Sequence, residues 1–209
     1  MTDHCTDNEA DRALGKLWER AFMALVKRFK HCPVIPNQQN HEGAAVAYGP
    51  DGKLMTIADV QVLADPNEHH EIKHKNATRD GCYGLEEFRF KSLYQLTSYH
   101  VGEVLYTIHD WDLAGGRELK VNKLKHWRTV RIADLARCQY KVRVGSTWCN
   151  GHLEQRPIYY WPTDAWTALA SWWNVGPTAK PAPDKVWTPE TLAWLDDYVA
   201  AERKYWGTP

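Results

Sequence analysis

Residues 57–75, IADVQVLADPNEHHEIKHK, limit the possible folds of this chain more than any other segment. Two strand-like runs are separated by Asp-Pro-Asn-Glu, a group of turn formers, and this pattern predicts a β-hairpin. Alternate side chains of a strand point to the same face, so Glu71 and Lys73 share one face of the second strand. Cross-strand pairing can bring Asp59, on the first strand, close to Glu71. The hairpin therefore predicts charged side chains that converge inside a sheet.

A helix is predicted before the hairpin, over residues 8–31, because apolar residues recur there every three or four positions. The recurring residues are Leu14, Leu17, Trp18, Phe22, Leu25, Val26 and Phe29. Pro33 and Pro36 cannot continue a helix, so the helix is expected to end before them, in a connecting segment.

The elements around the hairpin predict the fold class. Gly-Pro-Asp-Gly at residues 49–52 predicts a turn between two strands within residues 44–64. Residues 76–84 are rich in turn formers and predict a loop. The other elements are a third strand at residues 69–75, a helix at residues 85–100 and a buried strand at residues 103–111. The order αβββαβ predicts an α/β fold with a mixed central sheet flanked by helices.

The C-terminal part of the chain is rich in tryptophan, with eight of the eleven Trp residues after residue 145. Aromatic residues at helical spacing are usually core residues, so this part is predicted to pack on the rest; a base-stacking or oligomer surface is the alternative. We therefore expect a core over residues 1–115 and an extension over residues 116–209, joined in one globular unit. The extension is expected to contain helix within residues 116–138, helices at residues 163–173 and 188–205, and strands at residues 140–144 and 157–162.

Composition excludes some functional classes and leaves others open. The 26 basic and 26 acidic residues cancel, so the protein is not coated in positive charge. Residues 117–143 nevertheless carry nine Lys or Arg residues against two acids, which fits either phosphate binding or a solvated helix face. The chain contains no run of about 18 apolar residues, so no membrane span is predicted. Five cysteines without a Cys-x-x-Cys pair indicate reduced thiols and a cytoplasmic protein.

The charged residues of the hairpin suit metal-assisted chemistry. Two converging carboxylates, here Asp59 and Glu71, repel each other unless a proton or a cation lies between them. Carboxylate oxygens suit Mg²⁺ or Mn²⁺, which accept substrate phosphate as a further ligand. Lys73 beside them can orient or activate water, or stabilise charge on a phosphate. The plain alternative is an exposed cross-strand salt bridge between Glu71 and Lys73, which stabilises little.

With these residues, the chain resembles the PD-(D/E)XK nuclease superfamily. That superfamily has an αβββαβ core, an acid on the second strand and (D/E)-x-K on the third. Asp59 matches the acid, Glu71-Ile72-Lys73 matches the triplet, and Glu19 in LGKLWERAF matches an acid that many members carry on the first helix. The resemblance covers roughly residues 8–110. Ala58 departs from the pattern, because relatives often have proline before the acid.

The resemblance implies a restriction-endonuclease-like core and a Mg²⁺- or Mn²⁺-dependent nuclease that acts on DNA. It implies that Asp59 and Glu71 hold one or two metal ions and that Ile72 contributes its backbone carbonyl. Lys73 would position or activate the attacking water, and Glu19 would be an outer ligand or hold a water. A homodimer is compatible with the resemblance.

Five residues are candidates for contacts with nucleic acid. In the predicted loop, Arg79 could bind phosphate and Tyr83 could stack on a base, although a plain surface loop explains both. Lys91 and Gln95 are four residues apart and share a face of the following helix. Lys75 shares the strand face of Glu71 and Lys73.

Two other functional classes remain open. His69, His70 and His74 could indicate zinc and a different hydrolase, but His70 and His74 lie on the face opposite Glu71, so no compact ligand set forms easily. The second class is a non-catalytic nucleic-acid-binding or assembly protein that retains the nuclease fold. The neutral charge and the many tryptophans favour this class.

Overall fold

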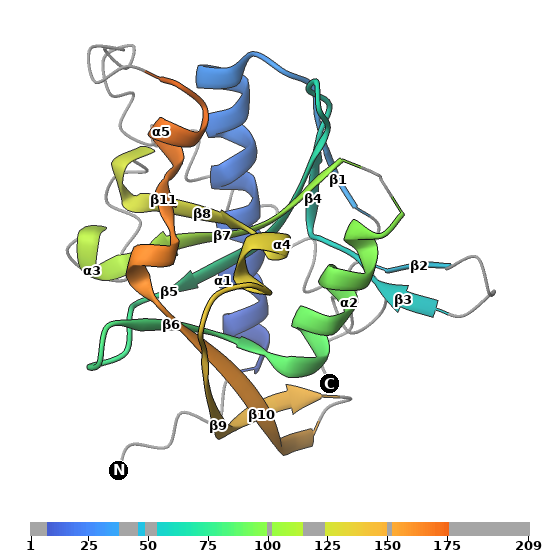
Figure 1. The fold of residues 1–209 in the computed structure, drawn as a ribbon. Helices are drawn as coiled ribbons and strands as arrows, with labels where there is room; N and C mark the ends of the chain where they lie inside the picture. The colour runs from blue at the N-terminus through green and yellow to red at the C-terminus, as the bar shows by residue number, and fades with distance from the viewer. Residues whose placement is uncertain are drawn as a thin grey trace.

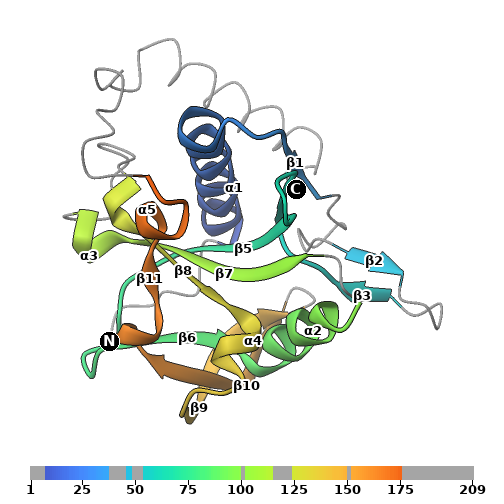
Figure 2. The ribbon, with the colours of Figure 1, turned by 45° about the horizontal axis from the view of Figure 1, so that its top comes forward.

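The structure is a computed structural model that describes residues 8–37, 46–48, 54–99, 102–114, 124–149 and 152–175. Its centre is a six-stranded sheet with the strand order β1-β4-β5-β7-β8-β11 (Figure 1). The pair β5–β7 is parallel, whereas the neighbouring pairs are antiparallel, so the sheet is mixed. Helix α1 covers one face, and α2 and α4 cover the other (Figure 2). The fold is therefore mixed α/β with a flanked central sheet, as predicted.

Helix α1 spans Asn8–Leu25 and continues as a π-helical turn, Val26–Lys30. Its apolar stripe includes Trp18, Phe22 and Leu25, which are buried against β4 and β5. The helix ends at His31, whose backbone is left-handed (φ 55°) and whose N–H donates to the Val26 carbonyl at 3.0 Å. The predicted helix over residues 8–31 is thus confirmed.

The first strand of the sheet lies in a segment that was expected to be a connection. Strand β1, Val34–Pro36, pairs antiparallel with β4, Val60–Val62. Proline cannot donate to a strand ladder, but β1 is an edge strand, where a missing donor can face solvent. The two prolines therefore ended the helix as predicted without excluding a strand.

The second predicted strand is divided in two. Strands β2, Val46–Tyr48, and β3, Leu54–Thr56, form a separate hairpin. Residues 57–59 leave strand geometry, and β4 begins at Val60 in the central sheet. This break allows Asp59 to lie at the start of β4, beyond the end of its ladder.

Strand β5, Glu68–Lys75, lies in the middle of the sheet. It pairs antiparallel with β4, with Val60 opposite His70, and parallel with β7, Glu103–Asp110. Helix α2, Glu87–Thr97, makes the crossover that a parallel pair requires. The order α1-β1-β4-β5-α2-β7 has the predicted αβββαβ pattern, consistent with a restriction-endonuclease-like core. Its first strand is β1, however, and not the strand that was predicted before Gly49, which is β2 of the separate hairpin.

The C-terminal part supplies strands to the same sheet. Strand β8, Trp127–Arg131, pairs with β7, and β11, Thr167–Ala168, pairs with β8. The predicted helices here were largely wrong: the short helical elements are α3 (Trp111–Ala114), η2 (Leu124–His126), α4 (Ile132–Leu135), η3 (Thr163–Ala165) and α5 (Leu169–Trp172). Trp127 packs in the core under α1 and Val130 in the core under α2, an alternation that requires a strand.

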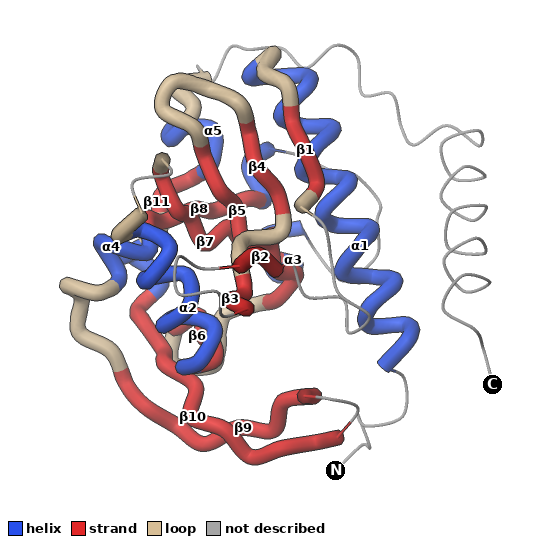
Figure 3. The backbone as a smooth tube through the Cα atoms, turned by 90° about the vertical axis from the view of Figure 1, so that its right-hand side faces the viewer, coloured by secondary structure: helices blue, strands red, loops and turns tan. Residues whose placement is uncertain are grey.

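A second sheet, β6-β10-β9, lies on the α2 side of the molecule. Its strands are β6 (Cys82–Glu86), β9 (Lys141–Cys149) and β10 (His152–Pro162), and Figure 3 shows β9 and β10 as a long ribbon. The prediction of a loop over residues 76–84 was therefore wrong for β6. Gly84 permits close pairing, because an added Cβ would come within 2.6 Å of Cε1 of Tyr160.

Several tryptophans pack on the sheet. Trp161 and Trp166 belong to the core under α2, whereas Trp172 and Trp173 pack against the core under α1. The predicted helix over residues 188–205 lies outside the described residues, as do Trp187, Trp194 and Trp206. Within the described part of the chain, no helix is long and apolar enough to cross a membrane.

Candidate active site

Asp59 is held at the point where β4 begins. The β4–β5 ladder ends at the pair Val60–His70, so the N–H of Ile72 lies beyond it. That N–H donates instead to Oδ2 of Asp59 at 2.8 Å. The Asp59 side chain is buried and takes the position of a strand partner for β5. This geometry explains why an aspartate stands where an apolar strand residue would be expected.

Glu71 and Lys73 lie beside Asp59. Glu71 is fully buried, and Nζ of Lys73 is 2.6 Å from its Oε1, an ion pair whose geometry is not that of a well-directed hydrogen bond. The same Nζ is 3.8 Å from Oδ2 of Asp59. One ammonium group therefore lies within reach of both carboxylates, and the Lys73 side chain is 36% exposed.

Arg89 completes the cluster and was not predicted. It lies in the first turn of α2, and its Nη2 makes a short charged hydrogen bond to Oε2 of Glu71. The same nitrogen donates to the Ile57 carbonyl at 2.9 Å and lies 3.6 Å from Oδ1 of Asp59. One sequence signal could have identified Arg89. It lies four residues before Leu93 and seven before Leu96, the other buried residues of α2, so it is a charged residue on the apolar stripe of the helix.

The electrostatics separate the two carboxylates. Burial raises the pKa of Glu71, but Arg89 and Lys73 outweigh burial and bring it to about 2. Burial and the neighbouring Glu71 raise the pKa of Asp59, and Lys73 and Arg89 compensate only in part. Burial lowers the pKa of Lys73, but Glu71 and Asp59 hold it above its ordinary value. Lys73 is therefore protonated at neutral pH. The two acids are not equivalent, because the pKa of Glu71 is lowered and that of Asp59 is raised.

Glu19 reaches the cluster from α1. Burial, followed by the charge of Asp59, raises its pKa to about 7, although Lys16 and Lys73 act in the opposite direction. Nζ of Lys16 lies 3.8 Å from Oε2 of Glu19, so this ion pair is a weak one. Glu19 is thus a carboxyl group that can accept or release a proton near neutral pH.

The donors of the cluster fit Mg²⁺ or Mn²⁺ better than zinc. Among the described residues, no three His, Cys, Asp or Glu side chains are arranged to hold a metal ion by themselves. Magnesium needs fewer protein ligands, since it commonly uses one or two carboxylates together with waters and phosphate. Oε1 of Glu71 makes no directed hydrogen bond in the described structure, but Nζ of Lys73 lies 2.6 Å from it, so a metal ion that uses this oxygen must displace the ammonium group. Asp59, Glu71 and the Ile72 carbonyl are the predicted ligands.

Three residues that were predicted to contact nucleic acid lie around β6. Arg79 is exposed in the turn before this strand. Tyr83 is a buried residue of β6 that packs edge-on against Trp166, so the prediction that it lies in a loop was wrong. Its ring is not available for stacking on a base in this conformation. Nζ of Lys75 donates to the Gly84 carbonyl at 2.6 Å and so ties β5 to β6.

The two predicted contact residues on α2 lie away from Arg89. Lys91 is exposed and pairs with Glu87, one helical turn earlier, at 2.7 Å. Gln95 is exposed and donates to the Tyr99 hydroxyl at 3.0 Å. Their roles in binding remain predictions.

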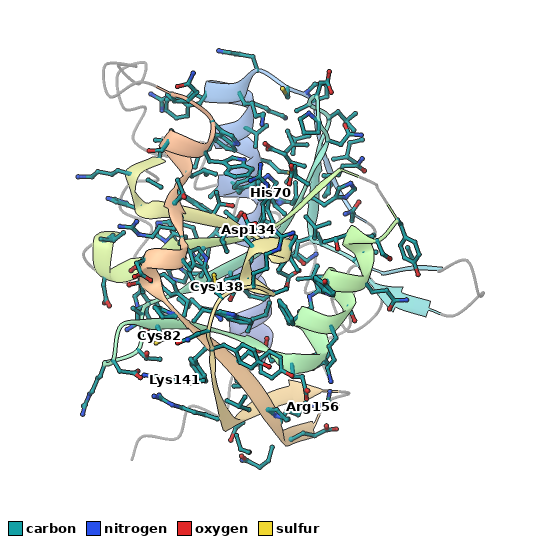
Figure 4. The ribbon with its side chains drawn as sticks, viewed as in Figure 1. His70, Cys82, Asp134, Cys138, Lys141 and Arg156 are labelled. Carbon is teal, nitrogen blue, oxygen red and sulfur yellow. The ribbon has the colours of Figure 1, made fainter. Side chains whose placement is uncertain are left out.

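A second buried polar cluster surrounds Glu68 on the opposite face of β5 and was not predicted. Oε1 of Glu68 accepts hydrogen bonds from Lys30 (2.5 Å) and Trp172 (3.0 Å). Its Oε2 contacts Trp173 (3.3 Å) and Nε2 of His70 (3.1 Å). The other nitrogen of His70, a residue labelled in Figure 4, lies 2.8 Å from the Thr107 hydroxyl. Thr107 in turn lies 2.9 Å from the Thr129 hydroxyl, so the network crosses three strands.

His74 is also separate from the carboxylate pair, because it lies on the face of β5 opposite Glu71. His74 stacks on Trp18, with ring centroids 4.3 Å apart, and its Nδ1 lies 3.1 Å from Nδ1 of His109. Trp18 also stacks on His109, at 3.8 Å. Burial, with His74 and His126 nearby, lowers the pKa of His109 to about 3. These rings form an aromatic core under α1.

No family model and no curated protein sequence matches the chain. Among solved structures, one similar chain is the Holliday junction resolvase Hjc from Archaeoglobus fulgidus, an archaeal hyperthermophile. The two chains are 10% identical, and the match covers 77% of this chain and 95% of the resolvase with a TM-score of 0.42. A likeness at this level carries no conclusion about the activity of the chain.

Proposed function

We propose that this protein is a Mg²⁺- or Mn²⁺-dependent nuclease of the PD-(D/E)XK type that hydrolyses phosphodiester bonds in DNA. The observation that carries the proposal is the convergence of Asp59, Glu71 and Lys73 at the start of β4, where one ammonium lies within reach of two buried carboxylates. An ordinary exposed cross-strand salt bridge would not bury Glu71 completely. DNA as the partner, rather than RNA, follows from the family resemblance.

The roles of the residues follow from their charges. Asp59 and Glu71 would hold the metal ion, which stabilises negative charge on a phosphate and activates water when it is bound. Lys73 keeps its proton at neutral pH, so it orients the water or the phosphate through an N–H donor rather than acting as a base. Glu19, with a pKa of about 7, is the group of the cluster best suited to accept a proton from water near neutral pH.

A cleavage assay tests the proposal. Linear, nicked, branched and single-stranded DNA would be incubated with the protein and Mg²⁺ or Mn²⁺, beside the variants Asp59→Asn, Glu71→Gln and Lys73→Met. We expect metal-dependent cleavage that each substitution lowers by about 10²- to 10⁴-fold, as for the loss of several kcal/mol of charge stabilisation. Arg131→Gln is the matched control, because Arg131 also pairs with a glutamate, Glu103, at 2.7 Å on the same sheet.

A second candidate is a non-catalytic nucleic-acid-binding or assembly protein. It is favoured by the presence of Arg89 between the two carboxylates, since an arginine there neutralises them without a metal ion. Binding of DNA by the wild type, without cleavage of any of these substrates in either metal, would establish this candidate instead of the nuclease.

A homodimer and a cytoplasmic location are further parts of the proposal. The thiols of Cys32, Cys82 and Cys138 are free, which fits a reducing compartment. Light scattering at several protein concentrations would measure the oligomeric state.

A further inference from the structure

The charges of the candidate site balance without a metal ion. Asp59 and Glu71 carry two negative charges when ionised, and Lys73 and Arg89 carry two positive charges. Each of the two basic groups lies within 3.8 Å of each of the two carboxylates. A divalent cation that entered beside both basic groups would give the cluster an excess of positive charge in a buried environment, which is costly.

Arg89 is the basic group most closely placed to oppose a metal ion. Its side chain is 7% exposed, and Nη2 contacts the same carboxylates that would be metal ligands. By contrast, Lys73 is 36% exposed and has room to move toward solvent. Among the described residues, Nη1 of Arg89 is buried and has no hydrogen-bond partner. The guanidinium is therefore fixed by the carboxylates but incompletely satisfied.

The position of Arg89 on its helix supports this view. The first turn of α2, an 11-residue helix, presents the positive end of the helix dipole, which disfavours a cation. A guanidinium in that turn is thus held by its partners, Glu71, Asp59 and the Ile57 carbonyl, rather than by its own helix. Its partial satisfaction and its helix position both indicate a group that can be released when the carboxylates take another cation.

We propose that Arg89 is the resident counter-cation of the candidate site and competes directly with a divalent metal ion for Glu71 and Asp59. This inference rests on the proposed function. Metal binding requires the guanidinium to withdraw from Glu71, so the free protein binds metal weakly. The released guanidinium, with its unused Nη1 donor, is then available to a phosphate oxygen, so that metal and a phosphodiester favour each other's binding.

The experiment measures metal binding rather than activity. Mn²⁺ would be titrated into protein stripped with EDTA, and bound ion would be measured by electron paramagnetic resonance. We expect Arg89→Gln to bind Mn²⁺ at least about tenfold more tightly than the wild type, since a competing charge within about 4 Å is removed. Arg131→Gln should match the wild type within about twofold, because its ion pair with Glu103 is on another part of the sheet.

A measurement on the wild type covers the case in which Arg89→Gln does not fold. The side-chain Nε–H signal of Arg89, identified by its loss in Arg89→Lys, would be followed by NMR during a Mg²⁺ titration. We expect a saturable shift of this signal. An unchanged signal at Mg²⁺ saturation, or Mn²⁺ affinity in Arg89→Gln that is equal to or below that of the wild type, would overturn the inference.

The two proposals fail in different ways. Metal-dependent cleavage together with an Arg89→Gln variant of unchanged Mn²⁺ affinity would leave the nuclease standing and remove the competition. No measurable Mn²⁺ binding by the wild type, by Arg89→Gln or by Arg131→Gln would overturn the metal site itself, and the competition with it.

Discussion

Strand β5 carries two buried glutamates, Glu68 and Glu71, only three residues apart and on opposite faces of the sheet. In both, burial raises the pKa but neighbouring groups bring it down to about 2: His70 and Lys30 for Glu68, and Arg89 and Lys73 for Glu71. A buried charge and a low pKa are therefore common to the two. Neither property distinguishes a structural carboxylate from a functional one.

The difference lies in how their oxygens are used. Each oxygen of Glu68 has two polar partners, and these come from the end of α1, from β5 itself and from the segment around α5. Glu71 has an oxygen without a directed hydrogen bond, and beside it lies a second carboxylate, Asp59, whose pKa moves in the opposite direction. Opposed pKa shifts in neighbouring acids are typical of catalytic sites. The cluster around Glu68 is closed, because all of its oxygens have polar partners, and it stabilises the fold. The cluster of Asp59, Glu71, Lys73 and Arg89 is open and can exchange a cation.

The largest expected effect separates the two glutamates by activity. Glu71→Gln should lower metal-dependent DNA cleavage by about 10³-fold, because a metal ligand is lost. Glu68→Gln, measured per folded molecule, should stay within about threefold of the wild type, since Glu68 faces away from Asp59. Equal losses in both variants would show that the two clusters act as one unit, and the comparison would fail.

The next effect concerns the stability that the Glu68 cluster provides. Glu68→Gln should lower the free energy of unfolding by about 3 kcal/mol, because the partly buried ammonium group of Lys30 would lose its carboxylate and keep only a neutral amide as partner. Urea unfolding in EDTA and in Mn²⁺ would measure this loss, which we expect to be the same in both, as no metal touches this cluster. A loss that Mn²⁺ restores would place the metal at Glu68 instead.

Glu19 differs from the two glutamates of β5, because its pKa is raised and theirs are lowered. The free energy of unfolding should therefore depend on pH near neutrality through Glu19. Its pKa is about 7 in the folded protein against 4.5 for an ordinary glutamate, so the folded state holds a proton that the unfolded state releases between these values. Stability in EDTA should therefore fall as pH rises from 4.5 to 7, and Glu19→Gln should remove about 2 kcal/mol of that fall. Urea midpoints at pH 5 and pH 8 measure it, and equal slopes for wild type and variant would contradict it.

The sequence predicted the open cluster better than the closed one, for a physical reason. Asp59, Glu71 and Lys73 lie close together in the chain, and the two-residue period of a strand was enough to bring them together. Arg89 came from another element, and only its place on an apolar helical stripe marked it. Glu68 stood in the predicted turn, and its partners come from segments as distant as Trp172. Pairings of that separation leave no local pattern.

The same reasoning explains the elements that were missed. Strands β6, β8 and β11 owe their geometry to partner strands rather than to their own sequence, so tertiary pairing overrode local propensity. Strand β1 directly follows Pro33 and contains Pro36, and local rules assign a segment with two prolines to a connection. Helices α1 and α2 and strands β5 and β7 had clear periodicity and were predicted.

The smallest expected effect tests the far end of the closed cluster. Thr129→Val removes a hydroxyl that lies 2.9 Å from the Thr107 hydroxyl, while Thr107 keeps its contact with His70. Because valine fills the same volume and leaves one buried hydroxyl with fewer partners, stability should fall by about 1 kcal/mol. Mn²⁺ affinity and DNA cleavage should not change, since the network ends at Glu68 and does not reach Glu71. A change in Mn²⁺ affinity greater than about threefold would mean that β5 transmits strain from one face to the other, and the two carboxylates could no longer be treated as independent.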